Sequence, residues 1–256
     1  MSPELETALA AARAAAEIAR RWFRGTFDVT TKADLTPVTR ADVECEQAIR
    51  GIILERFPDH GFYGEETGLT EEESPNLWLV DPIDGTKAFV RGYPFFSTQI
   101  ALVRDGVPVL GVSSAPLFGE LAWAEAGAGA WLDGERVHVS AIDRLEAAAL
   151  STGNLKSLAR SEGWNRLGEI VRSVDRIRGY GDFYHYHLLA SGRIDAVVES
   201  DVAVLDVAAL SVIVREAGGV FTDLNGAPVG LGTRSVLAAN PALHGTLLEK
   251  LRGWVA

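Results

Sequence analysis

Cysteine is almost absent from this sequence. The single thiol, Cys45, excludes an intramolecular disulfide and a metal cluster held by thiolates, and it fits a reducing compartment. Long apolar runs are missing too, because the longest stretch without Asp, Glu, Lys or Arg covers only residues 106–119 and contains two prolines. The N-terminal region also has no cleavable apolar segment. We therefore expect a cytoplasmic protein without a membrane partner.

Basic residues are outnumbered and scattered along the chain. The 24 Lys and Arg residues stand against 35 Asp and Glu residues, which gives a net charge of -11. Because nucleic acids bind to clustered positive charge, we expect no nucleic-acid partner. With 256 residues and 47% hydrophobic content, the chain can bury a core as one large domain or as two coupled lobes.

Two helices are predicted near the N-terminus. Residues 3–25 are rich in alanine, with acids early and arginines late, the order that the helix dipole favours. Residues 39–57 form the second predicted helix, in which Thr39 is the N-cap and Pro58 ends the helix. We expect the inward face of this helix to comprise Val43, Ile49, Ile53 and Phe57.

The rest of the chain divides into two patterns. Short apolar stretches separated by Gly and Pro predict a mostly antiparallel sheet from residue 76 to about residue 140. Beyond it, strand-like and helix-like segments alternate, as is typical of an α/β arrangement. We therefore predict an N-terminal α+β lobe over residues 1–140 and a C-terminal α/β lobe over residues 141–256. No flexible linker separates them, so the lobes should share an interface.

Two carboxylates stand close together in "DPIDGTKAF", residues 81–89. Asp81 follows the apolar "LWLV" and should stand at the end of a buried strand that Pro82 terminates. Asp84 falls on the next turn, where its carboxylate can point back toward Asp81 and the Ile83 carbonyl offers a third oxygen. The alternative interpretation is an Asp-Pro turn in which Asp84 only caps a helix.

The residues after this turn favour an anion site. Gly85 and Thr86 begin a short helix, whose first N–H groups have no acceptor within the helix and would hold a group such as phosphate. The segment thus offers a cation site beside an anion site.

Further acids lie outside this segment. Glu65 and Glu66 precede a glycine in "YGEETG", where a solvated loop is the alternative interpretation, and Asp206 opens a predicted helix, where an N-cap is the alternative. Several acids at apolar strand ends cannot all ionise in a low-dielectric cleft unless a cation compensates them. Oxygen ligands without cysteine or histidine select Mg²⁺ over zinc. The number of acids is sufficient for more than one ion.

Three motifs carry a family resemblance. "GEE", "WLVDPIDGTKAF" and "LDVAALSVIVREAGG" resemble, in order and approximate spacing, the motifs of the inositol monophosphatase family, and "TKADLTPVTRAD" resembles its N-terminal element. The match covers nearly the whole chain. The resemblance implies a layered α/β/α/β/α sandwich, a phosphatase dependent on two or three Mg²⁺ ions, a small phosphate ester as substrate, and a homodimer.

The resemblance also implies roles for single residues. The implied metal ligands are Glu65, Asp81, the Ile83 carbonyl, Asp84 and Asp206. The backbone N–H groups of Gly85 and Thr86 would bind phosphate, and Lys32 would lie at the mouth of the site. Asp42 would pair with Thr86 to orient a water that Glu65 helps to deprotonate, with in-line attack and no covalent intermediate.

The substrate is predicted from departures within these motifs. Inositol enzymes commonly read Thr-Thr-Asn-Phe where this chain has "TKAF", and Trp-Asp where it has Leu205-Asp206. "RGYGDFYHYHLLASGRID" instead resembles the histidinol-phosphate phosphatase branch. Asp182 and Glu199 would suit the ammonium and imidazole of histidinol phosphate, unless they are a helix cap and a surface acid. Glu199 could equally accept hydroxyls of inositol 1-phosphate. A branch acting on 3'-phosphoadenosine 5'-phosphate usually has Glu in place of Ala88.

Other classes fit the sequence less well. Haloacid dehalogenase enzymes carry Asp-x-Asp-Gly-Thr near the N-terminus, whereas two residues separate Asp81 from Asp84 here. A binding module without turnover would have no reason to keep like charges together. His185 and His187 are two positions apart on a predicted helix and face different sides, so we expect them to pack in the protein rather than to bind a metal.

Overall fold

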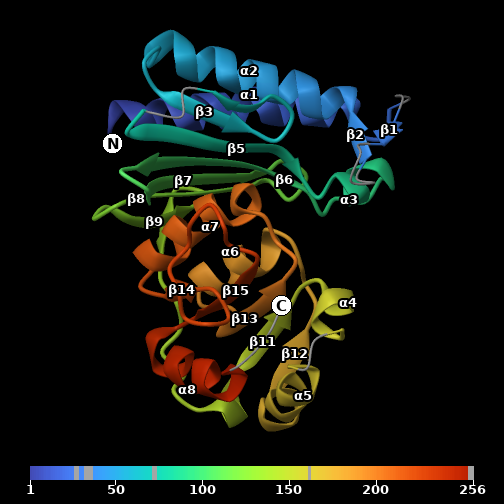
Figure 1. Ribbon diagram of the computed structural model, residues 1–256, viewed down its shortest axis with the longest axis vertical. Coiled ribbons are helices and arrows are strands. Elements are labelled where there is room, and N and C mark those ends of the chain that lie inside the picture. The colour runs from blue at the N-terminus through green and yellow to red at the C-terminus, as the bar shows by residue number, and fades with distance from the viewer. Residues whose placement is uncertain (26–28, 32–36, 71–73, 161–162, 253–256) are drawn as a thin grey trace.

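The computed structural model describes residues 1–25, 29–31, 37–70, 74–160 and 163–252. Within these ranges the chain forms five layers, in the order helices, sheet, helices, sheet, helices (Figure 1). This arrangement confirms the predicted layered α/β/α/β/α fold. No helix in the described ranges has both the length and the apolar character needed to cross a membrane.

Two antiparallel helices, α1 (Pro3–Trp22) and α2 (Arg40–Arg56), form the first layer. Both were predicted, and Thr39 caps α2 by accepting the N–H of Ala41 at 3.1 Å. The prediction that Val43 faces inward was wrong, because its side chain is 39% exposed. The inward face holds two acids in its first two turns, so apolar residues alone did not reveal it. The buried stripe comprises Asp42, Cys45, Glu46, Ile49 and Ile53.

The larger sheet forms the second layer and is mostly antiparallel, as predicted. Its strand order is β10-β9-β8-β7-β6-β5-β3-β4, and β3 runs parallel to β5. A separate pair, β1 (Val29–Thr31) and β2 (Pro37–Thr39), lies beside α3 (Thr86–Val90). The strands of the larger sheet are β3 (Gly61–Gly64), β4 (Gly68–Thr70), β5 (Asn76–Asp84), β6 (Ser97–Arg104), β7 (Val107–Ala115), β8 (Glu120–Glu125), β9 (Gly129–Leu132) and β10 (Glu135–Val137).

Strand β5 is buried on both faces. Trp78 and Val80 pack in the core beneath α1 and α2, whereas Leu79 packs in the core on the opposite face. A strand covered on both sides is apolar at successive positions, which explains the run "LWLV". The strand continues past Pro82 to Asp84 with a shift of register against β6, so the prediction that Pro82 ends it was wrong.

Helices α6 (Tyr184–Ala190) and α7 (Val204–Glu216) form the middle layer. Most side chains of α7 are buried, because sheets cover it on two sides. The helix lies so close to β7 that a Cβ on Gly111 would be 2.2 Å from the carbonyl oxygen of Ala209. Glycine at position 111 therefore allows α7 to approach the larger sheet.

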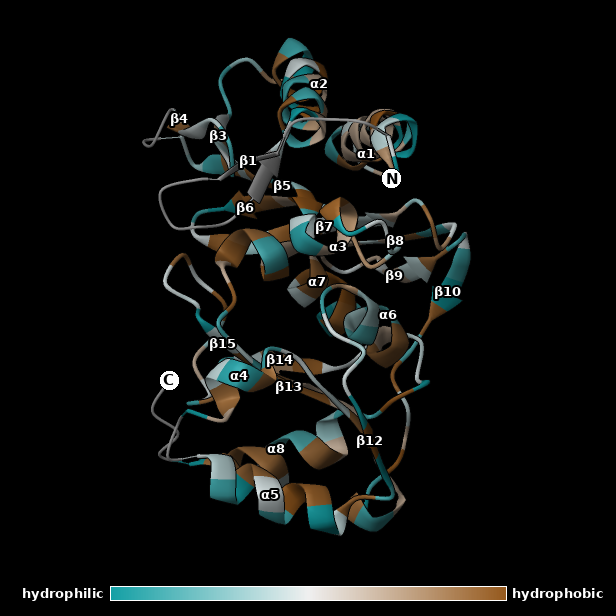
Figure 2. Cartoon of the chain, turned by 90° about the vertical axis from the view of Figure 1, so that its right-hand side faces the viewer, coloured by the Kyte–Doolittle hydropathy of each residue, from teal (hydrophilic) through white to brown (hydrophobic). Residues whose placement is uncertain are grey.

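The smaller sheet and the last helices complete the molecule. Its order is β12-β11-β13-β15-β14, and α5 and α8 cover its outer face. In outer helices such as α2 and α5, hydrophilic and hydrophobic residues alternate along the ribbon (Figure 2). The elements are η1 (Leu145–Ala147), β11 (Ala149–Thr152), α4 (Leu155–Leu158), α5 (Trp164–Ser173), β12 (Arg176–Arg178), β13 (Ala196–Ser200), β14 (Val220–Thr222), β15 (Ser235–Ala239) and α8 (Pro241–Leu251). The division into lobes at residue 140 stays a prediction.

Candidate active site

The motif "DPID" forms the irregular end of β5. Oδ1 of Asp81 accepts the N–H of Ile83 at 3.0 Å, which bends the chain around the proline between them. The pairing with β6 resumes at Asp84. Gly85 follows with φ of +90°, and a Cβ there would lie 2.5 Å from the carbonyl oxygen of Phe95. Glycine at this position lets the chain turn directly into α3.

Three carboxyl groups converge at this turn. One oxygen from each of Asp81, Asp84 and Asp206 lies within 4.8 Å of the other two. Asp206 comes from the first turn of α7, where its Oδ2 accepts the N–H of Ala203 at 2.7 Å. Asp206 is therefore a helix cap and a member of the acidic cluster at once, since one carboxylate has oxygens for both.

The acids of this cluster have raised pKa values. Burial, followed by repulsion from Glu65, Asp84 and Asp206, holds the pKa of Asp81 well above its usual range. Burial, followed by repulsion from Asp182 and Asp206, does the same to the pKa of Asp84. Burial raises the pKa of Asp206 to about 6. A divalent cation among these oxygens would favour their ionised forms, and a set of oxygen donors suits Mg²⁺.

Glu65 stands on the turn between β3 and β4 and lines the same cleft as the cluster. A buried acid that the sequence analysis did not single out, Glu46, holds this turn in place. Its two carboxylate oxygens accept the N–H groups of Glu66 at 2.7 Å and Thr67 at 2.8 Å. A Cβ on Gly64 would lie 2.4 Å from the Glu46 carboxyl carbon, so the turn packs tightly against α2.

Asp42 links helix α2 to the turn at Gly85 and Thr86 that starts α3. Its Oδ2 accepts the backbone N–H of Thr39 at 2.8 Å and the Thr39 hydroxyl at 2.6 Å. Its Oδ1 lies 3.3 Å from the hydroxyl oxygen of Thr86, which is also 3.0 Å from the Ile83 carbonyl oxygen. Asp42 therefore serves the helix cap and also pairs with Thr86. Lys32, predicted at the mouth of the site, lies outside the described residues.

The predicted substrate contacts lie across the cleft. Glu199, on β13, is buried; its Oε2 accepts the Tyr186 hydroxyl at 2.7 Å and lies 3.1 Å from Nε2 of His185. Asp182 is exposed to solvent at the rim, yet desolvation within the cleft, followed by Glu199, raises its pKa to about 6. His187, like His185, is buried and hydrogen-bonded.

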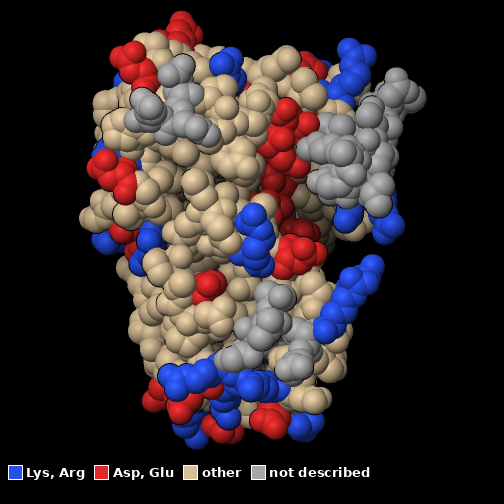
Figure 3. Space-filling view, in the orientation of Figure 1, with Lys and Arg blue, Asp and Glu red and all other residues tan. Residues whose placement is uncertain are grey.

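The cleft lined by the acidic cluster, Glu65, Thr86 and Asp182 has a volume of about 370 Å³. Acidic side chains run down one face of the molecule toward a hollow near its middle (Figure 3). Tyr93 and Asn154 also line the cleft, although no sequence motif predicted them there. Asn154 has φ of +50° and starts α4, and its side chain donates to the Asp201 carbonyl oxygen at 3.1 Å.

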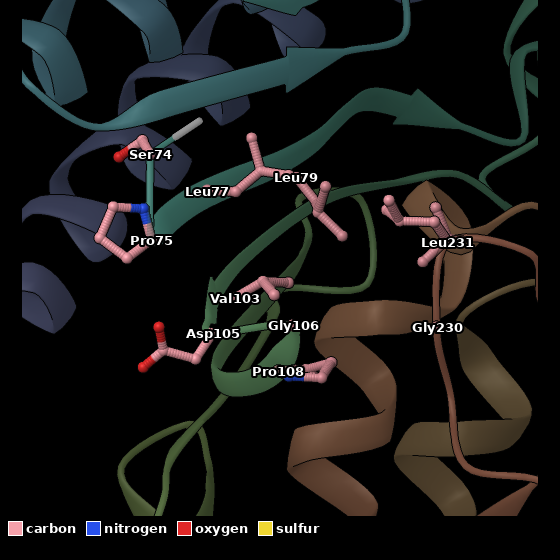
Figure 4. Close-up of a pocket in the computed structure, with 11 residues that line it drawn as sticks. Ser74, Pro75, Leu77, Leu79, Val103, Asp105, Gly106, Pro108, Gly230 and Leu231 are labelled. Atoms are coloured by element: carbon pink, nitrogen blue, oxygen red, sulfur yellow. The ribbon is translucent and has the colours of Figure 1, made fainter. Parts of the chain in front are cut away.

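A second hollow, of about 190 Å³, has different chemistry (Figure 4). Leu77, Leu79 and Val103 line it from the larger sheet, and Leu231 lines it from the opposite side. Asp105 is the single acid among its lining residues. The described residues that line this hollow include no group of carboxylates to hold a cation, so the acidic cleft is the candidate active site.

Acids that converge beside the start of a helix, in a five-layered α/β fold whose relatives are named phosphatases, place the chain among the hydrolases of phosphoric monoesters. The model of one protein family, described as inositol monophosphatase family, matches residues 1–255. The chain belongs to the inositol monophosphatase family, as its motifs predicted.

The relatives of this chain include histidinol-phosphatases and inositol monophosphatases. A histidinol-phosphatase from Mycobacterium tuberculosis is 43% identical over 255 residues, covering 97% of each chain. An inositol-1-monophosphatase from Caulobacter vibrioides is 34% identical, covering 95% of this chain and 98% of the relative. Among solved structures, the Thermotoga maritima IMPase has a TM-score of 0.87 and 30% identity, covering 98% of this chain and 97% of that one. The names of these relatives therefore agree on the enzyme class and differ in the substrate that they state.

Proposed function

We propose that this phosphatase depends on Mg²⁺ and hydrolyses histidinol phosphate. The observation that carries the proposal is the shared cleft, in which the cluster of Asp81, Asp84 and Asp206 lies beside Gly85 and faces Asp182. Cation-binding groups, a phosphate-binding turn and a negative group for a cationic substrate thus meet in one space.

The residues present fit the proposed cofactor. Glu65, Asp81, Asp84, Asp206 and the carbonyl oxygen of Ile83 would hold Mg²⁺, since all line the cleft and offer hard oxygen ligands. Bound Mg²⁺ supplies charge for the phosphate oxygens and lowers the pKa of water.

The chain's own residues then bind the phosphate and direct the proton. The N–H groups of Gly85 and Thr86, at the start of α3, donate to phosphate oxygens. Glu65 accepts the proton of the attacking water, and the Thr86 hydroxyl, held by Asp42, orients that water. The water oxygen bonds to phosphorus as the ester bond breaks, and the alcohol leaves with a proton from solvent.

The alcohol part of the substrate is recognised by residues on the wall of the cleft opposite the acidic cluster. The carboxylate of Asp182 is exposed at the rim and can accept hydrogen bonds from an ammonium or an imidazolium group. Glu199 lies deeper, where a small cavity of about 40 Å³ continues from the cleft between Asp84, Asp182 and Tyr186. Two acids at one end of the cleft favour a cationic substrate over a neutral one.

Inositol 1-phosphate is the second candidate. Glu199 can accept ring hydroxyls as well as a cation, and the relatives named inositol monophosphatase share the whole fold. 3'-Phosphoadenosine 5'-phosphate fits less well, because Ala88 stands where enzymes of that branch usually have Glu. A binding module without turnover fits least, since the acids remain clustered.

Phosphate release from the three esters, each with Mg²⁺ and with excess EDTA, tests the proposal. We expect turnover with Mg²⁺ alone and the highest kcat/KM on histidinol phosphate. A higher kcat/KM on inositol 1-phosphate would show that this ester, and not histidinol phosphate, is the preferred substrate. Turnover in EDTA would refute the dependence on Mg²⁺. The cytoplasmic location and the homodimer stay predictions, and light scattering at several protein concentrations tests the dimer.

Asp182→Asn separates the two leading substrates. Removing this charge should lower kcat/KM about 10-fold on histidinol phosphate, through KM, and change it less than about 2-fold on inositol 1-phosphate. Asp201→Asn, which removes an exposed acid whose backbone carbonyl accepts the Asn154 side chain, is the matched control and should leave kcat/KM on both substrates unchanged. Equal losses of kcat/KM on both substrates would show that Asp182 does not recognise the cationic group of histidinol phosphate.

A further inference from the structure

A chain of buried polar side chains runs from the acidic cluster across the larger sheet. Ser97 and Gln99, on β6, and Ser113, on β7, are all buried, and Gln99 pairs directly with Ser113 in the ladder. The Ser97 hydroxyl donates to Oδ2 of Asp84 at 3.3 Å. Burying three polar side chains on the inner strands of a sheet lowers stability unless they are hydrogen-bonded. We therefore expect each of them to have hydrogen-bond partners.

Gln99 is the branch point of this chain. Its Nε2 donates to the hydroxyl oxygen of Ser97 at 2.7 Å and to that of Ser113 at 3.1 Å. Its Oε1 has no hydrogen-bond partner among the described residues. A buried carbonyl oxygen without a partner lowers stability, and an apolar side chain of similar size would avoid that loss. The amide is therefore not explained by stability.

The far end of this series of side chains is anchored by the half-buried Glu120. Ser113 lies 2.9 Å from Nε2 of His187, and Nδ1 of the same ring lies 2.8 Å from Oε2 of Glu120. When the ring carries its proton on Nδ1, it donates to Glu120 and accepts the Ser113 hydroxyl. In this arrangement, every polar hydrogen of these hydrogen-bonded side chains has an acceptor.

The direction of the hydrogen bonds decides what Gln99 does. Because Nε2 occupies a lone pair on Ser97, the hydroxyl hydrogen of Ser97 is free to point at Asp84. With the amide reversed, Oε1 would draw that hydrogen away from Asp84, and Nε2 would have no acceptor. The orientation shown is the one that supports the Asp84 carboxylate.

We propose that Gln99 is a positioning residue for the metal site. Its amide, anchored through Ser113 and His187, directs the Ser97 hydroxyl onto Oδ2 of Asp84 and so fixes the carboxylate plane in which the other oxygen meets a cation. Gln99 touches neither substrate nor metal. The inference rests on the proposed Mg²⁺ dependence.

Calorimetric titration of the whole protein with Mg²⁺ alone tests this role without turnover. Ser97→Ala should weaken Mg²⁺ binding by about 10-fold, and Gln99→Met should weaken it by about 3- to 10-fold. These losses are on the scale of one hydrogen bond to a charged group. The double variant should bind no more weakly than Ser97→Ala, because Gln99 acts through Ser97. Losses that multiply in the double variant would overturn the inference.

A matched control separates positioning from general loss of stability. Thr222→Val removes a hydroxyl that lies 3.0 Å from Nε2 of His244, in the smaller sheet away from the cleft. It should lower the thermal midpoint and leave Mg²⁺ affinity unchanged. If Gln99→Met does not fold, Ser113→Ala removes the anchor of Gln99 and should weaken Mg²⁺ binding at least 2-fold; wild-type affinity in that variant would overturn the inference.

The proposed function and the positioning role fail differently. If the wild-type protein neither binds Mg²⁺ nor hydrolyses any of the three esters, the proposed function is refuted, and the role of Gln99 with it. If the wild type binds Mg²⁺ and Gln99→Met binds it equally well, only the positioning role is refuted. Weaker binding by Gln99→Met with the substrate KM unchanged supports both.

Discussion

Asp206→Asn should make the metal-free protein more stable at neutral pH. The folded-state pKa of Asp206 is about 6, above the ordinary value of 3.8, so its stabilising contribution is present below pH 3.8 and is lost as the pH rises through 6. At pH 7.5 the ionised group costs about 1–3 kcal/mol, with solvent in the cleft reducing the upper value. Asn removes this charge and can still accept the Ala203 N–H. The thermal midpoint should rise by about 2–10 °C.

Calorimetric scans in EDTA and in Mg²⁺, at pH 5 and pH 7.5, check this expectation. The difference between variant and wild type should shrink at pH 5, where Asp206 is largely protonated. Mg²⁺ should stabilise the wild type more than the variant. Asp195→Asn is the control, because this buried acid accepts the Ala149 N–H at 2.7 Å outside the cleft and should lower the midpoint at both pH values. A lower metal-free midpoint for Asp206→Asn at pH 7.5 would mean that Asp206 acts only as a helix cap.

Three further substitutions test the site and the fold. Asp84→Asn should abolish turnover and leave the metal-free midpoint equal or higher, since burial and neighbouring acids raise the pKa of this group; a clear fall measured by calorimetry would favour the capped-turn interpretation. Glu46→Gln should raise the Mg²⁺ concentration for half-maximal activity about 10-fold by loosening the turn that carries Glu65, whereas the exposed Glu17→Gln should change nothing. Gly111→Ala should lower stability to urea by about 1–3 kcal/mol, because the new Cβ would clash with the Ala209 carbonyl oxygen on α7, and unchanged stability would show that α7 can move away from β7 without loss.

The local elements were predictable because their signals are local. Alanine content, the Thr39 cap and the charge order defined α1 and α2, and the apolar runs defined the strands of both sheets. The errors fell where tertiary demands override local pattern. Val43 lies outside because acids occupy the inward face of α2, and β5 passes through Pro82 because its pairing with β6 resumes at Asp84.

The order of the motifs alone identified the acids of the site. In the structure, Asp81, Asp84 and Asp206 converge in one cluster. The side chains that support these acids were harder to predict from the sequence. Glu46 could have been found, since it follows Asp42 by one helical turn and so shares its face. Gln99 carried no such signal, because its partner Ser113 lies on another strand and the residue that anchors Ser113, His187, lies on α6.

By itself the sequence determined the helices and strands, the set of acidic residues and the family, because periodicity, capping and motif spacing depend on neighbours in the chain. The tertiary structure decided which acids share one cleft, that Asp42 both caps α2 and holds Thr86, and that a hydrogen-bonded chain supports Asp84. The contacts of Asp42 with Thr86 and of Ser97 with Asp84, and the convergence of Asp206 with Asp81 and Asp84, join elements that are separate in the sequence, and no local pattern encodes them.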